Sequence, residues 1–104
     1  MFVKQITLAE LDAKRFVIIE ALSEDSYKMG HIPNAINIPL EMIKDEAKRE
    51  LKDKTALIAV YSAGMHCGTA EKAAQELEKQ GYMNVHVLTG GKQEWKNAGR
   101  KFKT

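Results

Sequence analysis

The single cysteine of the chain, Cys67, lies in a short glycine-containing loop between an apolar run and an amphipathic run. The run 55–61 predicts a buried strand, and the run 69–80 predicts a helix. The amino end of a helix presents unpaired backbone N–H groups and the positive end of the helix dipole, and both favour a thiolate. We therefore expect the loop 62–68 to hold a reactive thiol or its persulfide.

Cysteine is also a common buried residue, so a structural role for Cys67 beneath the helix is the alternative. Gly64 and Gly68 favour a reactive thiol, because glycines open the backbone as anion-binding loops do. His66 could lower the thiol pKa or exchange protons with it, although we expect an exposed loop histidine. The pKa of Cys67 distinguishes these cases, since it lies low in a catalytic thiol and high in a buried structural one.

Other common kinds of site lack their residue patterns. A zinc site needs three or four converging ligands, and Cys67, His66 and His31 have no ligand-like spacing such as Cys-x-x-Cys. We expect His31 to hold its own turn by bonding to backbone, and His86 to be a surface residue of a strand. The loop glycines match neither a dinucleotide-binding nor a phosphate-binding motif. The sequence therefore predicts neither a metal nor a cofactor.

Composition limits the class of protein. The chain has 104 residues, 44% of them hydrophobic, which suits a single domain over 1–104. The 16 basic and 14 acidic residues leave a net charge of only +2, spread along the chain, unlike a nucleic-acid binder. No run approaches the roughly 20 apolar residues of a membrane span, and no signal-peptide pattern opens the chain. We expect a cytoplasmic protein that binds neither nucleic acid nor membrane.

Strand and helix patterns alternate along the rest of the chain. The expected strands are 16–19, 35–38, 55–61 and 85–88. The expected helices follow Thr7, cover 23–30, 40–51 and 69–80, and carry Trp95 after the glycine pair at 90 and 91. Such alternation predicts right-handed crossovers and a parallel sheet covered by helices on both faces. The Cys67 loop then lies at a strand-to-helix junction, where open α/β sheets carry their chemistry.

Three segments resemble the single-domain rhodanese family in order and spacing over nearly the whole chain. They are Gly-His-Ile-Pro-Asn-Ala-Ile-Asn-Ile-Pro at 30–39, Gly-Tyr-Met-Asn-Val at 81–85, and Leu-Thr-Gly-Gly at 88–91 with Trp95, Ala98 and Gly99. The resemblance implies an α/β fold of three layers, α/β/α, with a central parallel sheet of about five strands. It also implies sulfurtransferase activity, in which a loop cysteine takes a sulfane sulfur from thiosulfate or a persulfide donor. The acceptor would be cyanide, a thiol or a protein.

The chain departs from the family at the nucleophile. Ser62 stands where the family usually has its catalytic cysteine. An alcohol is a far weaker acid than a thiol of pKa about 8.5 and forms no stable persulfide, so Ser62 alone cannot carry sulfur. The family includes a longer-loop variant in which a second cysteine follows the first by five positions, and Cys67 matches that second cysteine. A Cys-to-Ser change is the usual way to disable such a site in the laboratory. A natural replacement would give the same serine, so the sequence does not distinguish the two origins of Ser62.

The family's arginines are also missing. Its acidic-x-Arg motif corresponds to 20–22, which reads Glu-Ala-Leu, and no arginine closes the loop. Anion binding then depends on the loop backbone, namely Ala63, Gly64, Met65, His66 and Gly68. The phosphatases that share the fold need a loop arginine, so we do not expect a phosphatase. Two functions remain: an impaired sulfurtransferase with Cys67 as its only carrier, and a non-catalytic module that binds a partner or anion.

Overall fold

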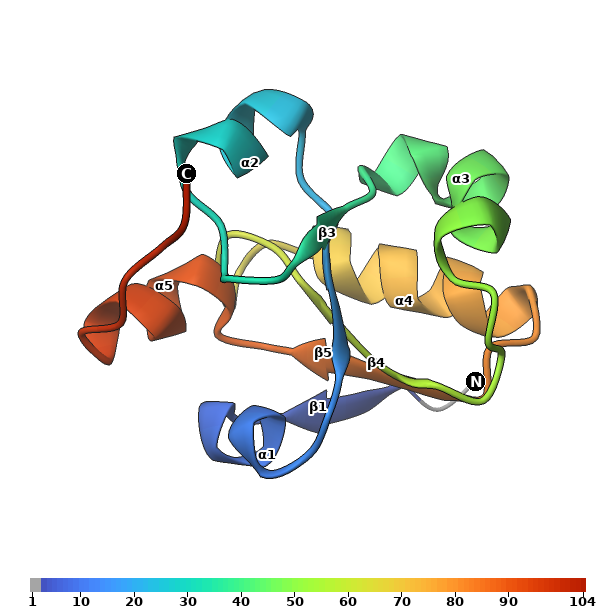
Figure 1. Ribbon diagram of the computed structural model, residues 1–104, viewed down its shortest axis with the longest axis horizontal. Coiled ribbons are helices and arrows are strands. Elements are labelled where there is room, and N and C mark those ends of the chain that lie inside the picture. The colour runs from blue at the N-terminus through green and yellow to red at the C-terminus, as the bar shows by residue number, and fades with distance from the viewer. Residues whose placement is uncertain (1–2) are drawn as a thin grey trace.

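The computed structural model describes residues 3–104 and has a central parallel sheet with helices on both faces (Figure 1). The sheet has five strands in the order β1-β5-β4-β2-β3, and every neighbouring pair is parallel. The strands are β1 (Lys4–Ile6), β2 (Val17–Glu20), β3 (Ile36–Asn37), β4 (Leu57–Tyr61) and β5 (Asn84–Leu88). This arrangement confirms the predicted α/β fold class.

The helices cover the two faces of the sheet unequally. They are α1 (Leu8–Ala13), α2 (Glu24–Met29), α3 (Ile43–Glu50), α4 (Thr69–Lys79) and α5 (Gly91–Asn97). The larger buried cluster joins the sheet to α3 and α4, with Val60 and Leu77 among its members. A smaller cluster on the other face joins the sheet to α1 and α5 through Leu11, Tyr61 and the partly buried Trp95. Strand β4, which leads into the loop 62–68 (the active loop), is therefore covered on both faces.

Most predicted elements are present, with shifted ends. The capping box is confirmed, because Thr7 accepts from the N–H of Glu10 and the Glu10 carboxylate accepts from the N–H of Thr7. The predicted helix 40–51 was wrong at its start, where a single 3₁₀ turn, Leu40–Met42, precedes α3. Strand β1 was not predicted. Within residues 3–104, no helix is long and apolar enough to cross a membrane.

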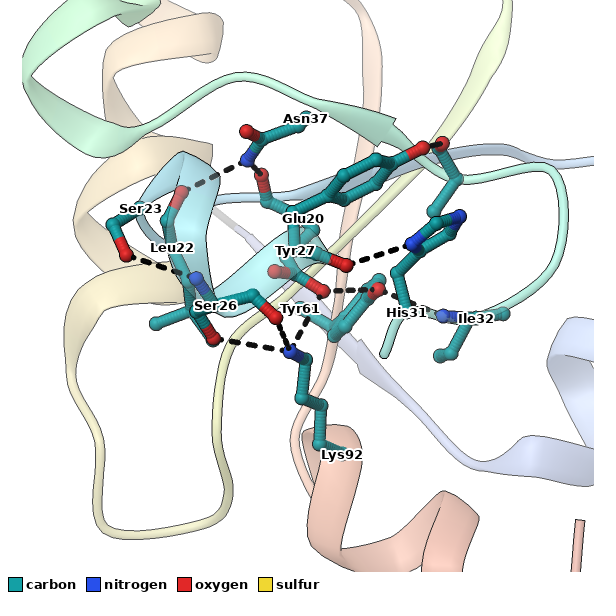
Figure 2. Close-up of polar contacts among 11 residues, drawn as sticks. Glu20, Leu22, Ser23, Ser26, Tyr27, His31, Ile32, Asn37, Tyr61 and Lys92 are labelled. Carbon is teal, nitrogen blue, oxygen red and sulfur yellow. Dashed lines mark hydrogen bonds and ion pairs between the residues drawn. The ribbon is translucent and has the colours of Figure 1, made fainter. Parts of the chain in front are cut away.

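A buried polar network joins the carboxyl ends of β2 and β4 to α2 and α5 (Figure 2). Glu20 is fully buried, and its Oε1 accepts from the Tyr61 hydroxyl at 2.6 Å. The Lys92 Nζ lies 3.3 Å from the same oxygen and donates to the backbone and side-chain oxygens of Ser26 at 2.9 and 3.0 Å. Burial, together with the Glu20 hydrogen bond, raises the pKa of Tyr61, which keeps this phenol protonated as the donor.

Removing one charge of this network should destabilise the fold strongly. Lys92→Met would leave the Glu20 carboxylate buried without its cation, and breaking a buried pair in this way costs about 3–5 kcal/mol of unfolding free energy. The double variant Glu20→Leu with Lys92→Met should recover part of that loss, since no charge stays buried while the Tyr61 hydroxyl loses its acceptor. Urea denaturation measures both effects.

The exposed pair of Lys28 and Glu24 provides the matched control. Its nitrogen and oxygen lie 3.1 Å apart, with 69% and 73% of the side chains exposed. Lys28→Met should therefore change the unfolding free energy by less than about 1 kcal/mol. A cost for Lys92→Met as small as that of Lys28→Met would show that the buried pair does not hold the fold.

Candidate functional site

The loop 62–68 leaves β4 and is fastened to the amino end of α5. The N–H of Lys92 donates to the carbonyl oxygen of Ser62 at 3.0 Å, and the N–H of Gln93 donates to that of Ala63 at 2.9 Å. Gly91 makes this approach possible, because a Cβ there would lie 2.3 Å from the Ser62 carbonyl oxygen and its φ is +54°. The double glycine therefore allows the amino end of α5 to lie close to the loop backbone.

Cys67 lies directly before Gly68, the residue that caps the amino end of α4. Its thiol is partly exposed, and its Sγ lies 3.3 Å from the Thr69 hydroxyl oxygen. The hydrogen bond with Thr69, then one with the Ser62 hydroxyl, and then the N–H groups of Thr69 and Ala63 lower the pKa of Cys67 to about 7. Burial opposes this shift but is the weaker effect. Near neutral pH a much larger share of this thiol is therefore ionised than of an ordinary cysteine.

Ser62 lies beneath the loop, with only 2% of its surface exposed. Its hydroxyl donates to the carbonyl oxygen of Cys67 at 3.3 Å, so the two candidate residues lie at the two ends of one closed turn. The N–H of Cys67 is occupied by the Gly64 carbonyl oxygen at 3.1 Å. Of the loop amides predicted to bind an anion, the N–H of Ala63 reaches the thiol, and the N–H of Thr69 was missed.

The remaining loop side chains lie away from the thiol's hydrogen bonds. Ala63, Met65 and His66 are exposed, and Met65 keeps 68% of its surface in solvent. Gly64 packs against the side chain of Gln93. A Cβ placed on Gly64 would lie 3.4 Å from the Cβ of Gln93. No atom of the described neighbours lies within 4 Å of a Cβ placed on Gly68. His66 thus lies in solvent, as the sequence predicted.

The other two histidines bond to backbone. His31 has its Nδ1 2.8 Å from the Tyr27 carbonyl oxygen and stacks on the Tyr27 ring, so it holds its own turn as predicted (Figure 2). His86 is half-buried rather than fully at the surface, and its Nδ1 lies 3.2 Å from the Ile58 carbonyl oxygen. Within the described chain, no three His, Cys, Asp or Glu side chains gather as metal ligands would.

Two pockets lie beside the loop. The first has a volume of about 620 Å³, and we call it the amide pocket because glutamine side chains line it. Its lining includes Gln5, Thr7, Met65, Thr89, Gln93 and Glu94. The basic pocket, of about 370 Å³, includes Met29, Ala63, Lys92, Lys96 and Phe102 in its lining. The loop contributes Met65 to the amide pocket and Ala63 to the basic pocket.

We compared the chain with models of known protein families. The model of the rhodanese-like domain family matches residues 4–98, which is nearly the whole chain. The chain belongs to the rhodanese-like domain family. The match covers β1 through α5, and thus both the loop 62–68 and the double glycine that fastens it.

Individual rhodanese-like relatives agree with this membership. A protein of Coxiella burnetii named thiosulfate sulfurtransferase GlpE is 32% identical over 100 residues, which are 92% of this chain and 90% of that protein. The tRNA uridine(34) hydroxylase of Erwinia tasmaniensis is 30% identical over 98 residues, but these are only 27% of that longer protein.

Solved structures share the fold closely. A thiosulfate sulfurtransferase from Pseudomonas aeruginosa superposes with a TM-score of 0.86 at 28% identity, over 96% of this chain and 20% of that chain. The rhodanese-like domain of the Alr3790 protein from Anabaena superposes with a TM-score of 0.85 at 28% identity, over 98% and 80% of the two chains. These relatives establish the family, while the residues at 62 and 67 determine what this loop can do.

Thr69→Val should raise the pKa of Cys67 above about 7, because the largest stabilising hydrogen bond to the thiolate is lost. The pH dependence of alkylation by iodoacetamide measures this pKa, since only the thiolate reacts. Ser62→Ala is the comparison and should raise the pKa by less. An unchanged pKa in Thr69→Val would contradict this assignment of the thiolate's main partner.

Gly91→Ala should displace the loop and cost about 1–3 kcal/mol or more of unfolding free energy, because its Cβ would overlap the Ser62 carbonyl oxygen at a positive φ. Gly68→Ala is the matched control, since nothing lies within 4 Å of its Cβ. Urea denaturation gives the free energies, and the alkylation rate of Cys67 reports the loop. Equal behaviour of the two variants would show that α5 does not hold the loop.

Proposed function

We propose that this chain is a sulfurtransferase in which Cys67 carries the sulfane sulfur, at a lower rate than a form with cysteine at 62. The observation that carries the proposal is the thiol pKa of about 7 at the amino end of α4. The relative named thiosulfate sulfurtransferase supports this reaction class. A small sulfur-containing anion or a persulfide would be the donor, and a protein could be the acceptor.

Both half-reactions balance without an external oxidant. The Cys67 thiolate attacks the outer sulfur of thiosulfate, the S–S bond of the donor breaks, and sulfite leaves with the electron pair. Cys67 then holds a persulfide. Cyanide or an acceptor thiolate attacks its outer sulfur, the bond to Cys67 breaks, and the electron pair returns to Cys67 as thiolate. The Ala63 and Thr69 N–H groups favour each anionic stage.

The basic pocket supports an anionic donor. It adjoins Ala63, whose N–H reaches the thiol, and none of the described residues that line it is acidic. Two of these residues are lysines, and the charge of Lys92 is paired with Glu20. Lys96 takes part in no ion pair within residues 3–104, so its charge is available to a ligand. An anion in this pocket would meet Lys96 beside the loop.

Ser62 is the reason for the expected low rate. The buried hydroxyl helps to stabilise the Cys67 thiolate but forms no stable persulfide. The chain therefore has one sulfur carrier where the long-loop variant has two thiols. A cytoplasmic setting fits this chemistry, since a lone thiol stays reduced there.

A non-catalytic module is the second candidate, and the serine at the nucleophile position favours it. The same loop amides and the basic pocket would then bind an anion or partner without covalent exchange. Cys67 would be a low-pKa thiol that takes no part in turnover.

Thiosulfate:cyanide activity, with intact mass, tests these candidates on the chain and its Ser62→Cys and Cys67→Ser forms. We expect weak activity and one added sulfur in the chain, loss of both in Cys67→Ser, and higher activity in Ser62→Cys. The rate of sulfur uptake should rise with pH through about 7 and then level off, because the thiolate is the nucleophile.

Other results would change the assignment. Activity confined to Ser62→Cys would make Cys67 auxiliary and the chain a disabled rhodanese. Silence in all three forms, with no added sulfur, would favour the binding module.

A further inference from the structure

The amide pocket has a chemical character of its own. It lies where the carboxyl ends of β1 and β5 meet the active loop, the position at which open α/β sheets bind ligands. Among residues 3–104, its polar lining consists of neutral amides and hydroxyls together with one carboxylate, that of Glu94, and includes no Lys, Arg or His side chain. Such a lining suits a polar ligand that is not an anion.

Glu94 is available to a ligand. None of the ion pairs within residues 3–104 includes its carboxylate. Arg100 feels the charge of Glu94, but its guanidinium is already bound by both oxygens of Asp12 at 2.9 and 2.6 Å. Arg100 also lies over the Trp95 ring. A cation in the pocket would therefore find Glu94 without a competing partner.

Thr89 adds a second, independent indication. Its hydroxyl oxygen is buried beside the same pocket and has no hydrogen-bond partner within the described residues. A buried hydroxyl without a partner is unfavourable, and native structures usually satisfy such groups with protein, water or ligand. An ammonium group brings three donors, so it could serve Glu94 and, once the Thr89 side chain turns its buried hydroxyl toward the pocket, Thr89 as well.

The two pockets beside the loop have opposite charge. The basic pocket contacts the loop at Ala63, whereas the amide pocket contacts it at Met65, and Gln93 lines both. An anionic donor is favoured on the Ala63 side and disfavoured by Glu94 on the Met65 side. Donor and acceptor could then use different sides of one loop.

We propose that the amide pocket binds a small aminothiol acceptor, with its ammonium group at Glu94 and Thr89 and its sulfur toward the active loop. This inference rests on the proposed sulfurtransferase function. The acceptor thiolate attacks the outer sulfur of the Cys67 persulfide and forms a new S–S bond. The bond to Cys67 breaks, and its electron pair leaves Cys67 as thiolate. The product is the persulfide of the aminothiol.

Binding can be tested without turnover, using ligands that cannot exchange sulfur. Nuclear magnetic resonance titration with 2-(methylthio)ethylammonium should shift the backbone signals of Thr89, Gln93 and Glu94 saturably, and 3-(methylthio)propionate should not. Glu94→Gln should weaken ammonium binding by about fivefold, the scale of one exposed charge pair. Glu50→Gln, an equal charge change at the end of α3, should leave it unchanged.

Kinetics on the persulfide-loaded protein tests the acceptor role. Cysteamine should be a better acceptor than 2-mercaptoethanol, and 3-mercaptopropionate the poorest of the three. Glu94→Gln should raise KM for cysteamine by about fivefold, with kcat and the KM for 2-mercaptoethanol unchanged. A general loss of activity with all three thiols would instead mean that Glu94 only maintains structure, and would overturn the proposal.

The two experiments separate the two proposals. If no persulfide forms on Cys67, the proposed function fails, while the titration still decides whether the pocket prefers an ammonium ligand. If the persulfide forms but carboxylate and ammonium ligands bind equally, or shift signals elsewhere, the amide-pocket proposal fails and the sulfurtransferase proposal stands.

Discussion

The active loop depends on one close approach between two backbones. The amino end of α5 donates two hydrogen bonds to the carbonyl oxygens of Ser62 and Ala63. At position 91 only glycine fits, because any Cβ would overlap the Ser62 carbonyl oxygen. The N–H of Cys67 is bonded to Gly64 within the loop, whereas the N–H groups of Ala63 and Thr69 reach the thiol. The hydroxyl groups of Thr69 and Ser62 lower the pKa of Cys67 most, and these two backbone N–H groups add to that effect.

Lys92 connects this loop to the other half of the sheet. Its backbone N–H fastens Ser62, while its side chain reaches Glu20 at the end of β2 and Ser26 in α2. Tyr61, the last residue of β4, donates to the same carboxylate and accepts from the N–H of Ile32 at 3.0 Å. This network thus joins the carboxyl ends of β2 and β4, next to the loop, to α2 and α5 (Figure 2).

The sequence predicted the layers and the loop because local patterns encode them. The run 57–61 is apolar on both faces, and the alanines of α4 recur at helical spacing, so burial alone specifies these elements. Strand β1 was missed because it has three residues at the sheet edge, only one of them buried. Lys92 was missed as a site residue because its partners, Glu20 and Ser26, lie in segments that only the folded chain brings together. Thr69 was missed although it lies only two residues from Cys67, and the Cys-Gly-Thr order was the signal that could have found it.

The fastening of the loop by α5 has a consequence for synthesis. The segment that holds the loop, 91–93, follows Cys67 by more than twenty positions in the chain, so it leaves the ribosome later. Until that segment has docked, the carbonyl groups of Ser62 and Ala63 lack these two hydrogen-bond donors. The loop that carries Cys67 can therefore reach its final conformation only after α5 has formed and packed against it.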